Sequence, residues 1–160
     1  HATTAMCLRW LEHVVCPQMR VYDVGCGSGI LAIAASKLGA GEVVAMDYDP
    51  VAVSVAEENI RANNVSNVAV FESDLLSVCA GLEPAHLITA NIIADIIIRL
   101  FEQLDRYLAP GGVLLASGII DDRIADVERA AAEHGFTVLD MTCEKEWAAM
   151  IIRRTVESGF

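Results

Sequence analysis

The sequence predicts an α/β fold: a Rossmann-like, doubly wound sheet of seven strands, mostly parallel, with a C-terminal antiparallel hairpin. Short β-type runs alternate with segments long enough for crossover helices, which parallel pairing requires. Hydrophobic residues make up 54% of the 160 residues, as expected for a sheet covered by helices on both faces. Only residues 143–146 separate the last two runs. Because four residues cannot hold a crossover helix, these two strands must pair antiparallel.

Seven runs show the β-type pattern, each rich in apolar or β-branched residues and bounded by polar or turn-forming ones. They are residues 20–25, 42–47, 68–72, 86–90, 112–117, 136–142 and 147–153. The runs at 42–47 and 112–117 are apolar enough to be covered on both faces. The first five runs, with helices between them, are expected to pair in parallel.

The first helix is indicated by apolar side chains at helical spacing, Leu8, Leu11 and Val15. Thr3 and Thr4 precede them and can cap this helix. A second helix is expected over residues 30–38, directly after a glycine-rich loop.

The third helix is marked at both ends. Asp49 can cap it, and Pro50 suits its first position because proline holds a helical φ and lacks only an N–H that has no partner there. Asparagines at 63–64 suit its end. Aspartates at 121–122 mark the start of the last helix.

The fourth helix begins near Ile93 and stops before Pro110. Its apolar stripe comprises Ile97, Leu100, Phe101, Leu104 and Leu108. Its polar positions, which we expect to face water, are Arg99, Glu102, Gln103 and Arg106.

Charge and hydropathy narrow the class of partner. The formal net charge is -11, from 22 acidic and 11 basic side chains, and it repels phosphate backbones, so no direct nucleic acid binding is expected. A basic protein or an amine is a more natural partner. No membrane span is expected, because the longest apolar runs, residues 30–35 and 147–152, are far shorter than the roughly 20 residues a spanning helix needs.

The five cysteines are scattered and form no C-x-x-C pair. This spacing favours reduced thiols in a cytoplasmic protein over a disulfide framework, and it predicts no metal site. At this length we expect one domain over residues 1–160. Because the first residue is His1 and not methionine, we expect the chain to be a piece of a longer protein.

The strongest motif is Asp-Val-Gly-Cys-Gly-Ser-Gly over residues 23–29, placed between a strand and a helix. Glycines let such a loop turn tightly beside a ligand, and the helix N-terminus offers free N–H groups. Asp47 lies 22 residues after Gly25, at the end of the second strand, where a carboxylate can accept hydrogen bonds from ribose hydroxyls. Ile30 stands where the dinucleotide fingerprint needs glycine, which favours S-adenosylmethionine over a nicotinamide cofactor.

The chain resembles the class I S-adenosylmethionine-dependent methyltransferases over essentially its whole length. The resemblance is carried by the glycine motif, Asp47, Leu-Ala-Pro-Gly-Gly at 108–112 and the closing hairpin. Three further segments narrow the resemblance to the PrmA-type family, which methylates ribosomal protein L11. They are His-Ala-Thr-Thr at 1–4, Asp-Tyr-Asp-Pro at 47–50 and Ala-Asn-Ile-Ile-Ala at 90–94. The family also carries an N-terminal substrate-recognition domain, which we expect to be missing here.

The resemblance implies a set of contacts to S-adenosyl-L-methionine. These are Thr4, Gly25, Gly27, Asp47, Asp74 and Asn91. It places the glycines under the methionine part, Asp47 at the ribose, Asp74 at the adenine amino group and Asn91 near the sulfonium. Asn91 is also the expected catalytic residue, because it can orient the acceptor amine without an obligate general base.

The implied activity is methyl transfer to amino groups, a lysine side chain or an N-terminal amine, of a basic protein of the large ribosomal subunit. A methyltransferase of a small molecule remains an alternative, since one fold serves many acceptors. A cofactor-binding module without turnover is another. A nicotinamide oxidoreductase ranks last.

Overall fold

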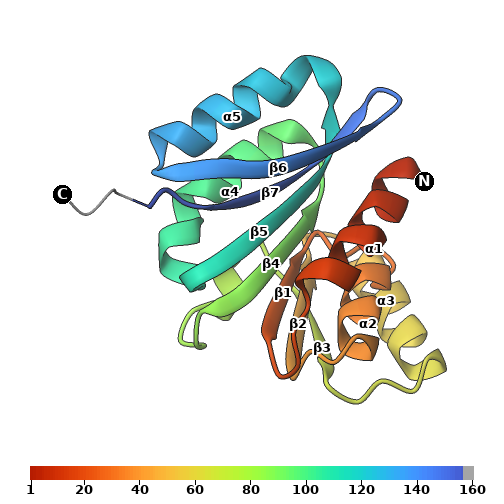
Figure 1. Cartoon of the computed structure of the whole chain (residues 1–160). Helices are drawn as coiled ribbons and strands as arrows, with labels where there is room; N and C mark the ends of the chain where they lie inside the picture. The colour runs from red at the N-terminus through yellow and green to blue at the C-terminus, as the bar shows by residue number, and fades with distance from the viewer. Residues whose placement is uncertain (157–160) are drawn as a thin grey trace.

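The computed structural model describes residues 1–156, which form one seven-stranded sheet with helices on both faces (Figure 1). The strands are β1 (Arg20–Val24), β2 (Glu42–Asp47), β3 (Val68–Glu72), β4 (Ala85–Asn91), β5 (Leu108–Ile120), β6 (Phe136–Glu144) and β7 (Trp147–Arg154). Their order across the sheet is β3-β2-β1-β4-β5-β7-β6. Within residues 1–156, β7 alone runs opposite to the other six strands, and it pairs antiparallel with both β5 and β6. The predicted fold class is therefore confirmed.

Five α-helices cover the sheet. On one face lie α1 (Ala2–Val14), α2 (Ile30–Lys37) and α3 (Pro50–Ala62), and on the other lie α4 (Ala94–Tyr107) and α5 (Ile124–Glu133), as Figure 1 shows. Because successive strand residues point to opposite faces, Val21 packs into one hydrophobic core and Tyr22 into the other. Two short 3₁₀ turns, Ser77–Cys79 and Asp121–Arg123, complete the elements.

Helix α3 has the ends that its sequence predicts. The Asp49 carboxylate accepts a hydrogen bond from the backbone N–H of Val51 at 2.9 Å, and Pro50 is the first helical residue. The helix ends at Ala62, and Asn64 follows with a φ of 56°. The capping prediction at both ends is confirmed.

The cap predicted for α1 is wrong. The helix begins at Ala2, so Thr3 and Thr4 lie inside its first turn. The cap is His1, whose ring Nδ1 accepts from the backbone N–H of Thr3 at 3.3 Å. The apolar periodicity shows which face is buried but does not show where the first turn closes.

Strands β4 to β7 all extend beyond their predicted ends, and the extensions of β5 and β6 change the connections between elements. Strand β5 starts at Leu108, directly after α4, and β6 continues to Glu144. The hairpin loop is therefore residues 145–146, and not the four residues 143–146. Lys145 adopts a left-handed φ of 55° there, as the tightest hairpin turns require. The strands stay paired up to the turn, where Glu144 pairs with Trp147. The local residue pattern does not show how far this pairing extends.

Two polar side chains of α4 do not simply face water. The backbone N–H of Leu76 donates to the Gln103 side-chain oxygen at 3.0 Å. The Arg99 guanidinium lies 3.6 Å from a carboxylate oxygen of Asp74. Gln103 is only half-buried and bonds to the backbone, so the prediction that it faces water was wrong. Arg99 is exposed as predicted, with 54% of its side-chain surface accessible, but it also pairs with Asp74. The reason is tertiary: the segment after β3 passes beside this helix.

All five cysteines are free. Among residues 1–156, no helix is both long and apolar enough to cross a membrane.

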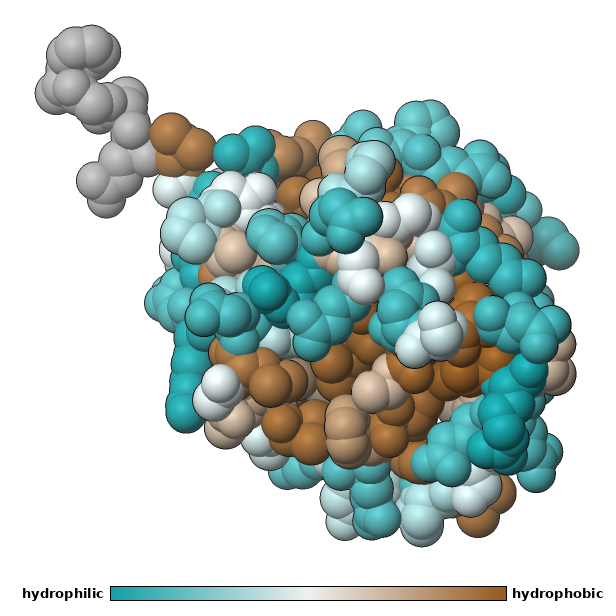
Figure 2. Space-filling view, turned by 90° about the horizontal axis from the view of Figure 1, so that it is seen from below, coloured by the Kyte–Doolittle hydropathy of each residue, from teal (hydrophilic) through white to brown (hydrophobic). Residues whose placement is uncertain are grey.

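Most large apolar side chains are buried in the two cores. Others reach the surface, and Figure 2 shows hydrophobic residues gathered in a hollow bordered by hydrophilic ones on the face seen from below.

Candidate functional site

The candidate site lies where the connections from two neighbouring strands diverge. After β1 the chain crosses through α2 to β2 on one side, and after β4 it crosses through α4 to β5 on the other. The carboxyl ends of β1 and β4 therefore form a topological switch point. Ligands of open α/β sheets bind in the crevice at such a point.

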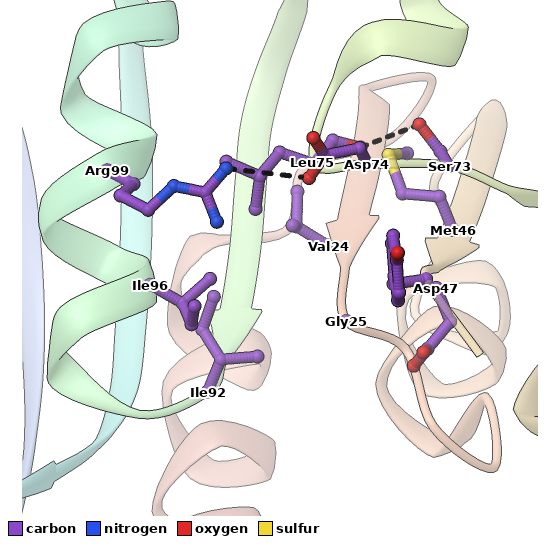
Figure 3. Close-up of a pocket in the computed structure, with 11 residues that line it drawn as sticks. Val24, Gly25, Met46, Asp47, Ser73, Asp74, Leu75, Ile92, Ile96 and Arg99 are labelled. Carbon is purple, nitrogen blue, oxygen red and sulfur yellow. Dashed lines mark hydrogen bonds and ion pairs between the residues drawn. The ribbon is translucent and has the colours of Figure 1, made fainter.

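A cavity of about 500 Å³ opens beside this switch point, a size typical of sites for small molecules and cofactors. Figure 3 shows α4 on one side of it and the ends of β1 and β2 on the other. It is lined by Val24, Gly25, Met46, Asp47, Tyr48, Ser73, Asp74, Leu75, Ile92, Ile96 and Arg99. Its walls combine apolar side chains with two carboxylates and one guanidinium.

The glycine-rich loop adopts backbone angles that residues with a Cβ atom rarely adopt. Gly25 and Gly27 have φ values of 67° and 52°, in the left-handed region that favours glycine. A Cβ at Gly25 would lie 2.4 Å from the Cγ2 atom of Ile92, whereas a Cβ at Gly27 would meet nothing within 4 Å. Gly25 thus permits the close approach of two strand ends. Gly27 leaves open space in front of the N-terminus of α2.

Asp47 holds the loop and still has capacity for a ligand. One carboxylate oxygen accepts from the backbone N–H of Gly27 at 2.9 Å, and the other accepts from that of Asp49 at 2.9 Å. A carboxylate has about four lone-pair sites, so two remain. The half-buried Asp47 can therefore accept from a pair of hydroxyl groups while it fixes the glycine loop.

The segment after β3 forms a further wall of the cavity, next to α4. Leu75 has a φ of 51°, a conformation that an apolar side chain rarely adopts. The Ser73 hydroxyl donates to the Leu75 carbonyl oxygen at 3.0 Å and accepts from the Val78 N–H at 3.1 Å. These bonds hold the turn, and the Asp74 side chain lies at the cavity edge (Figure 3).

Asn91 lies at the end of β4, next to the cavity. Its side-chain NH₂ donates to the Thr4 hydroxyl of α1 at 3.4 Å. Gly118, with a φ of 82°, makes room for it, because a Cβ there would lie 3.1 Å from the Asn91 side-chain oxygen. Asn91 and Thr4 therefore form a pair beside the cofactor-sized cavity, although only the next residue, Ile92, is part of its lining.

The structure thus gathers the six predicted residues into one region. Gly25, Asp47 and Asp74 line the cavity, Gly27 bonds to Asp47, and Thr4 bonds to Asn91. The other lining residues were not predicted: Val24, Met46, Tyr48, Ser73, Leu75, Ile92, Ile96 and Arg99. Tyr48 and Ile92 directly follow predicted site residues, which is a signal that could have identified them.

A buried carboxylate lies on β1, two residues before Gly25. Asp23 is 1% exposed; the Thr89 hydroxyl donates to its Oδ1 at 2.7 Å, and its Oδ2 has no partner within residues 1–156. Burial, with the nearby charge of Asp47, raises the pKa of Asp23 to about 7, and the Thr89 hydrogen bond opposes this shift. Asp23 therefore titrates near neutral pH.

This raised pKa predicts an unusual pH dependence of stability. Between the ordinary pKa of 3.8 and about 7, the folded protein holds one proton more than the unfolded chain. The Asp23 contribution to the free energy of unfolding should therefore fall by about 1.4 kcal/mol per pH unit as pH rises through this window. The free energy of unfolding of the cofactor-free protein can be measured in urea at several pH values. Its slope against pH should be less negative in Asp23→Asn than in the wild type, by about 1.4 kcal/mol per pH unit. Equal slopes in the two proteins would contradict the prediction.

The glycine loop also contains a cysteine, Cys26. Burial, together with the charges of Asp23 and Asp47, raises the pKa of the Cys26 thiol to about 12, so it is not a thiolate at neutral pH. Among the 156 described residues, no three His, Cys, Asp or Glu side chains are grouped so that they could hold a metal ion.

Comparison with known proteins identifies the family. The model of the PrmA family, described as ribosomal protein L11 methyltransferase, matches residues 1–155. A curated protein named ribosomal protein L11 methyltransferase in Thermoanaerobacter pseudethanolicus is 51% identical over 154 residues, which cover 96% of this chain and 49% of that protein. A protein of the same name in Heliobacterium modesticaldum is 50% identical over 156 residues, which cover 96% of this chain and 48% of that protein. The chain thus spans about half the length of these relatives.

A solved structure agrees with these relatives. The crystal structure of ribosomal protein L11 methylase from Lactobacillus delbrueckii subsp. bulgaricus superposes with a TM-score of 0.92 at 36% identity, covering 98% of this chain and 80% of that one. The fold, the positions of the sequence motifs and the named relatives therefore all indicate the same family. The chain belongs to the PrmA family of ribosomal protein L11 methyltransferases.

Proposed function

We propose that this chain binds S-adenosyl-L-methionine at the switch-point cavity and transfers its methyl group to amino groups of ribosomal protein L11. Membership of the family supports this proposal. The observation that carries it is the meeting of Gly25, Asp47 and Asp74 on one cavity, with the Asn91–Thr4 pair directly beside it.

The residues present fit the cofactor. Asp47 has two lone-pair sites left for the ribose hydroxyls, and Gly25 and Gly27 leave the loop open for the methionine part. Asp74 can accept from the adenine amino group, and the apolar wall, which includes Leu75, can cover the base. When bound, the cofactor supplies an electrophilic methyl group on a sulfonium.

The protein's task in this reaction is to position an amine that has given up its proton to water. A lysine with an ordinary pKa of about 10.4 must lose a proton, which costs about 4.6 kcal/mol at pH 7. Burial beside a cation lowers that pKa, so no strong base is needed. Asn91 offers a side-chain oxygen that can accept from the amine and aim its lone pair, and Thr4 holds the other end of the amide. Such positioning supplies much of the rate of a displacement.

The charge of the chain suits a basic protein as acceptor. The net charge of -11 attracts lysine-rich surfaces and raises their rate of encounter. The target is a lysine side chain or the N-terminal amine, because Asn91 can accept from either.

Calorimetry and a transfer assay test this proposal. The folded chain should bind S-adenosylmethionine and should not bind NAD. The full-length gene product should transfer tritiated methyl groups from S-adenosylmethionine to purified ribosomal protein L11, and mass spectrometry should locate them on amino nitrogens. Absence of S-adenosylmethionine binding to folded protein would refute the cofactor assignment. Methylation at oxygen or carbon would refute the amine assignment.

A further inference from the structure

The side chain of Arg99 is the least expected part of the cavity. It lies on α4, a helix whose polar positions were expected to be solvated, yet it lines the cavity together with Asp47 and Asp74. Figure 3 shows it extending from the helix toward the segment after β3, where its guanidinium lies 3.6 Å from Oδ1 of Asp74. An arginine thus brings positive charge to an otherwise acidic site.

Arg99 acts together with a second residue one helical turn later. Gln103 accepts from the backbone N–H of Leu76 at 3.0 Å, and residues four apart lie on the same side of a helix. The two side chains therefore contact successive parts of the turn that contains Asp74 and Leu75. Because Leu75 adopts a left-handed φ of 51°, this turn depends on surrounding contacts to keep its shape.

The contact also determines which carboxylate oxygen is available. Arg99 engages Oδ1 of Asp74, which leaves Oδ2 to accept from a ligand. Without the guanidinium, the Asp74 side chain would be free to rotate into water, since it is 61% exposed. Holding one oxygen in place reduces the entropy that a ligand must otherwise remove.

We propose that Arg99 is a positioning residue that holds Asp74 toward the adenine amino group and so helps the site to distinguish adenine from other bases. This inference rests on the proposed function, in which Asp74 contacts adenine. Arg99 acts through Asp74 and takes no part in methyl transfer. An exposed ion pair is worth up to about 1 kcal/mol, so the effect on base preference should be severalfold.

The test compares S-adenosylhomocysteine with S-inosylhomocysteine, in which a carbonyl oxygen replaces the amino group. The wild-type chain should bind the adenine ligand at least about tenfold more tightly, because the inosine ligand offers Asp74 an acceptor in place of a donor. Arg99→Ala should reduce this preference about threefold to fivefold. Arg99→Lys keeps the charge and should restore part of it, and Asp74→Ala should abolish it.

The matched control is Arg106→Ala. Arg106 lies on the same helix, packs over the Tyr107 ring at 5.3 Å and is absent from the cavity lining, so its removal should leave the preference unchanged. If Arg99 only supports the fold or covers the base, Arg99→Ala weakens both ligands equally, and the unchanged ratio overturns the inference. A wild-type chain that binds both ligands equally overturns it together with the adenine contact of Asp74. Loss of all binding by the wild type would instead contradict the cofactor assignment itself.

Discussion

Replacing Asp47 by alanine is expected to weaken the binding of S-adenosylmethionine about 100-fold, or roughly 2.7 kcal/mol. Two losses add in this variant. The ribose hydroxyls lose their acceptor, and the N–H groups of Gly27 and Asp49, which donate to Asp47 at 2.9 Å, lose theirs. The glycine loop therefore becomes less well ordered at the same time. Isothermal titration calorimetry measures the change in dissociation constant.

Asp49→Ala is the matched control for this prediction. Asp49 is also an aspartate of the same motif, but its carboxylate caps α3 by accepting from the Val51 N–H. Its removal should lower the free energy of unfolding by about 1 kcal/mol and leave cofactor affinity close to that of the wild type. An Asp47→Ala protein with wild-type affinity would disprove the ribose contact.

Replacing Asn91 by alanine is expected to lower kcat for methylation of ribosomal protein L11 about 100-fold, because misplacing a nucleophile by about 1 Å can cost that much. The variant lacks the side-chain oxygen that we assign to the amine and also the NH₂ group that donates to Thr4 at 3.4 Å. The rate is measured with the full-length gene product under saturating cofactor, so that a change in cofactor affinity does not contribute.

Two further variants make this experiment specific. Thr4→Val removes the partner of the Asn91 amide and should lower kcat by a smaller factor, since the acceptor oxygen is retained. Asn63→Ala removes an exposed asparagine at the end of α3 and should not change kcat. An Asn91→Ala enzyme with wild-type kcat would remove Asn91 from the mechanism.

Much of the cofactor site could be predicted because its residues lie at the ends of predictable strands. Gly25 follows β1, Asp47 ends β2, and Asn91 ends β4. Parallel strands bring their carboxyl ends to one edge of a sheet, so residues far apart in sequence converge there whatever the details of packing. The glycine motif and Asp47 are therefore close in space, as their hydrogen bond through Gly27 shows.

Other parts of the site depend on how separate helices, strands and turns pack together. The pattern of residues within each element does not show this packing. Arg99 and Gln103 occupy polar positions of α4, and helical period alone places them in water. They contact residues 74 and 76 because the turn after β3 lies against this helix. The raised pKa of Asp23 is similar, since it depends on how completely the surrounding elements exclude water.

The sequence by itself determined the seven strands, the glycine loop, the aspartate at the end of β2 and the family. These are local or topological properties: β-type patterning, positive φ at glycine, and the shared carboxyl edge of parallel strands. The tertiary structure alone decided the two-residue hairpin loop at 145–146, the wall held by Arg99 and Gln103, and the burial of Asp23. The hairpin loop depends on the pairing of Glu144 with Trp147. The other two features depend on contacts between segments distant in sequence, where packing geometry and exclusion of water set which side chains meet.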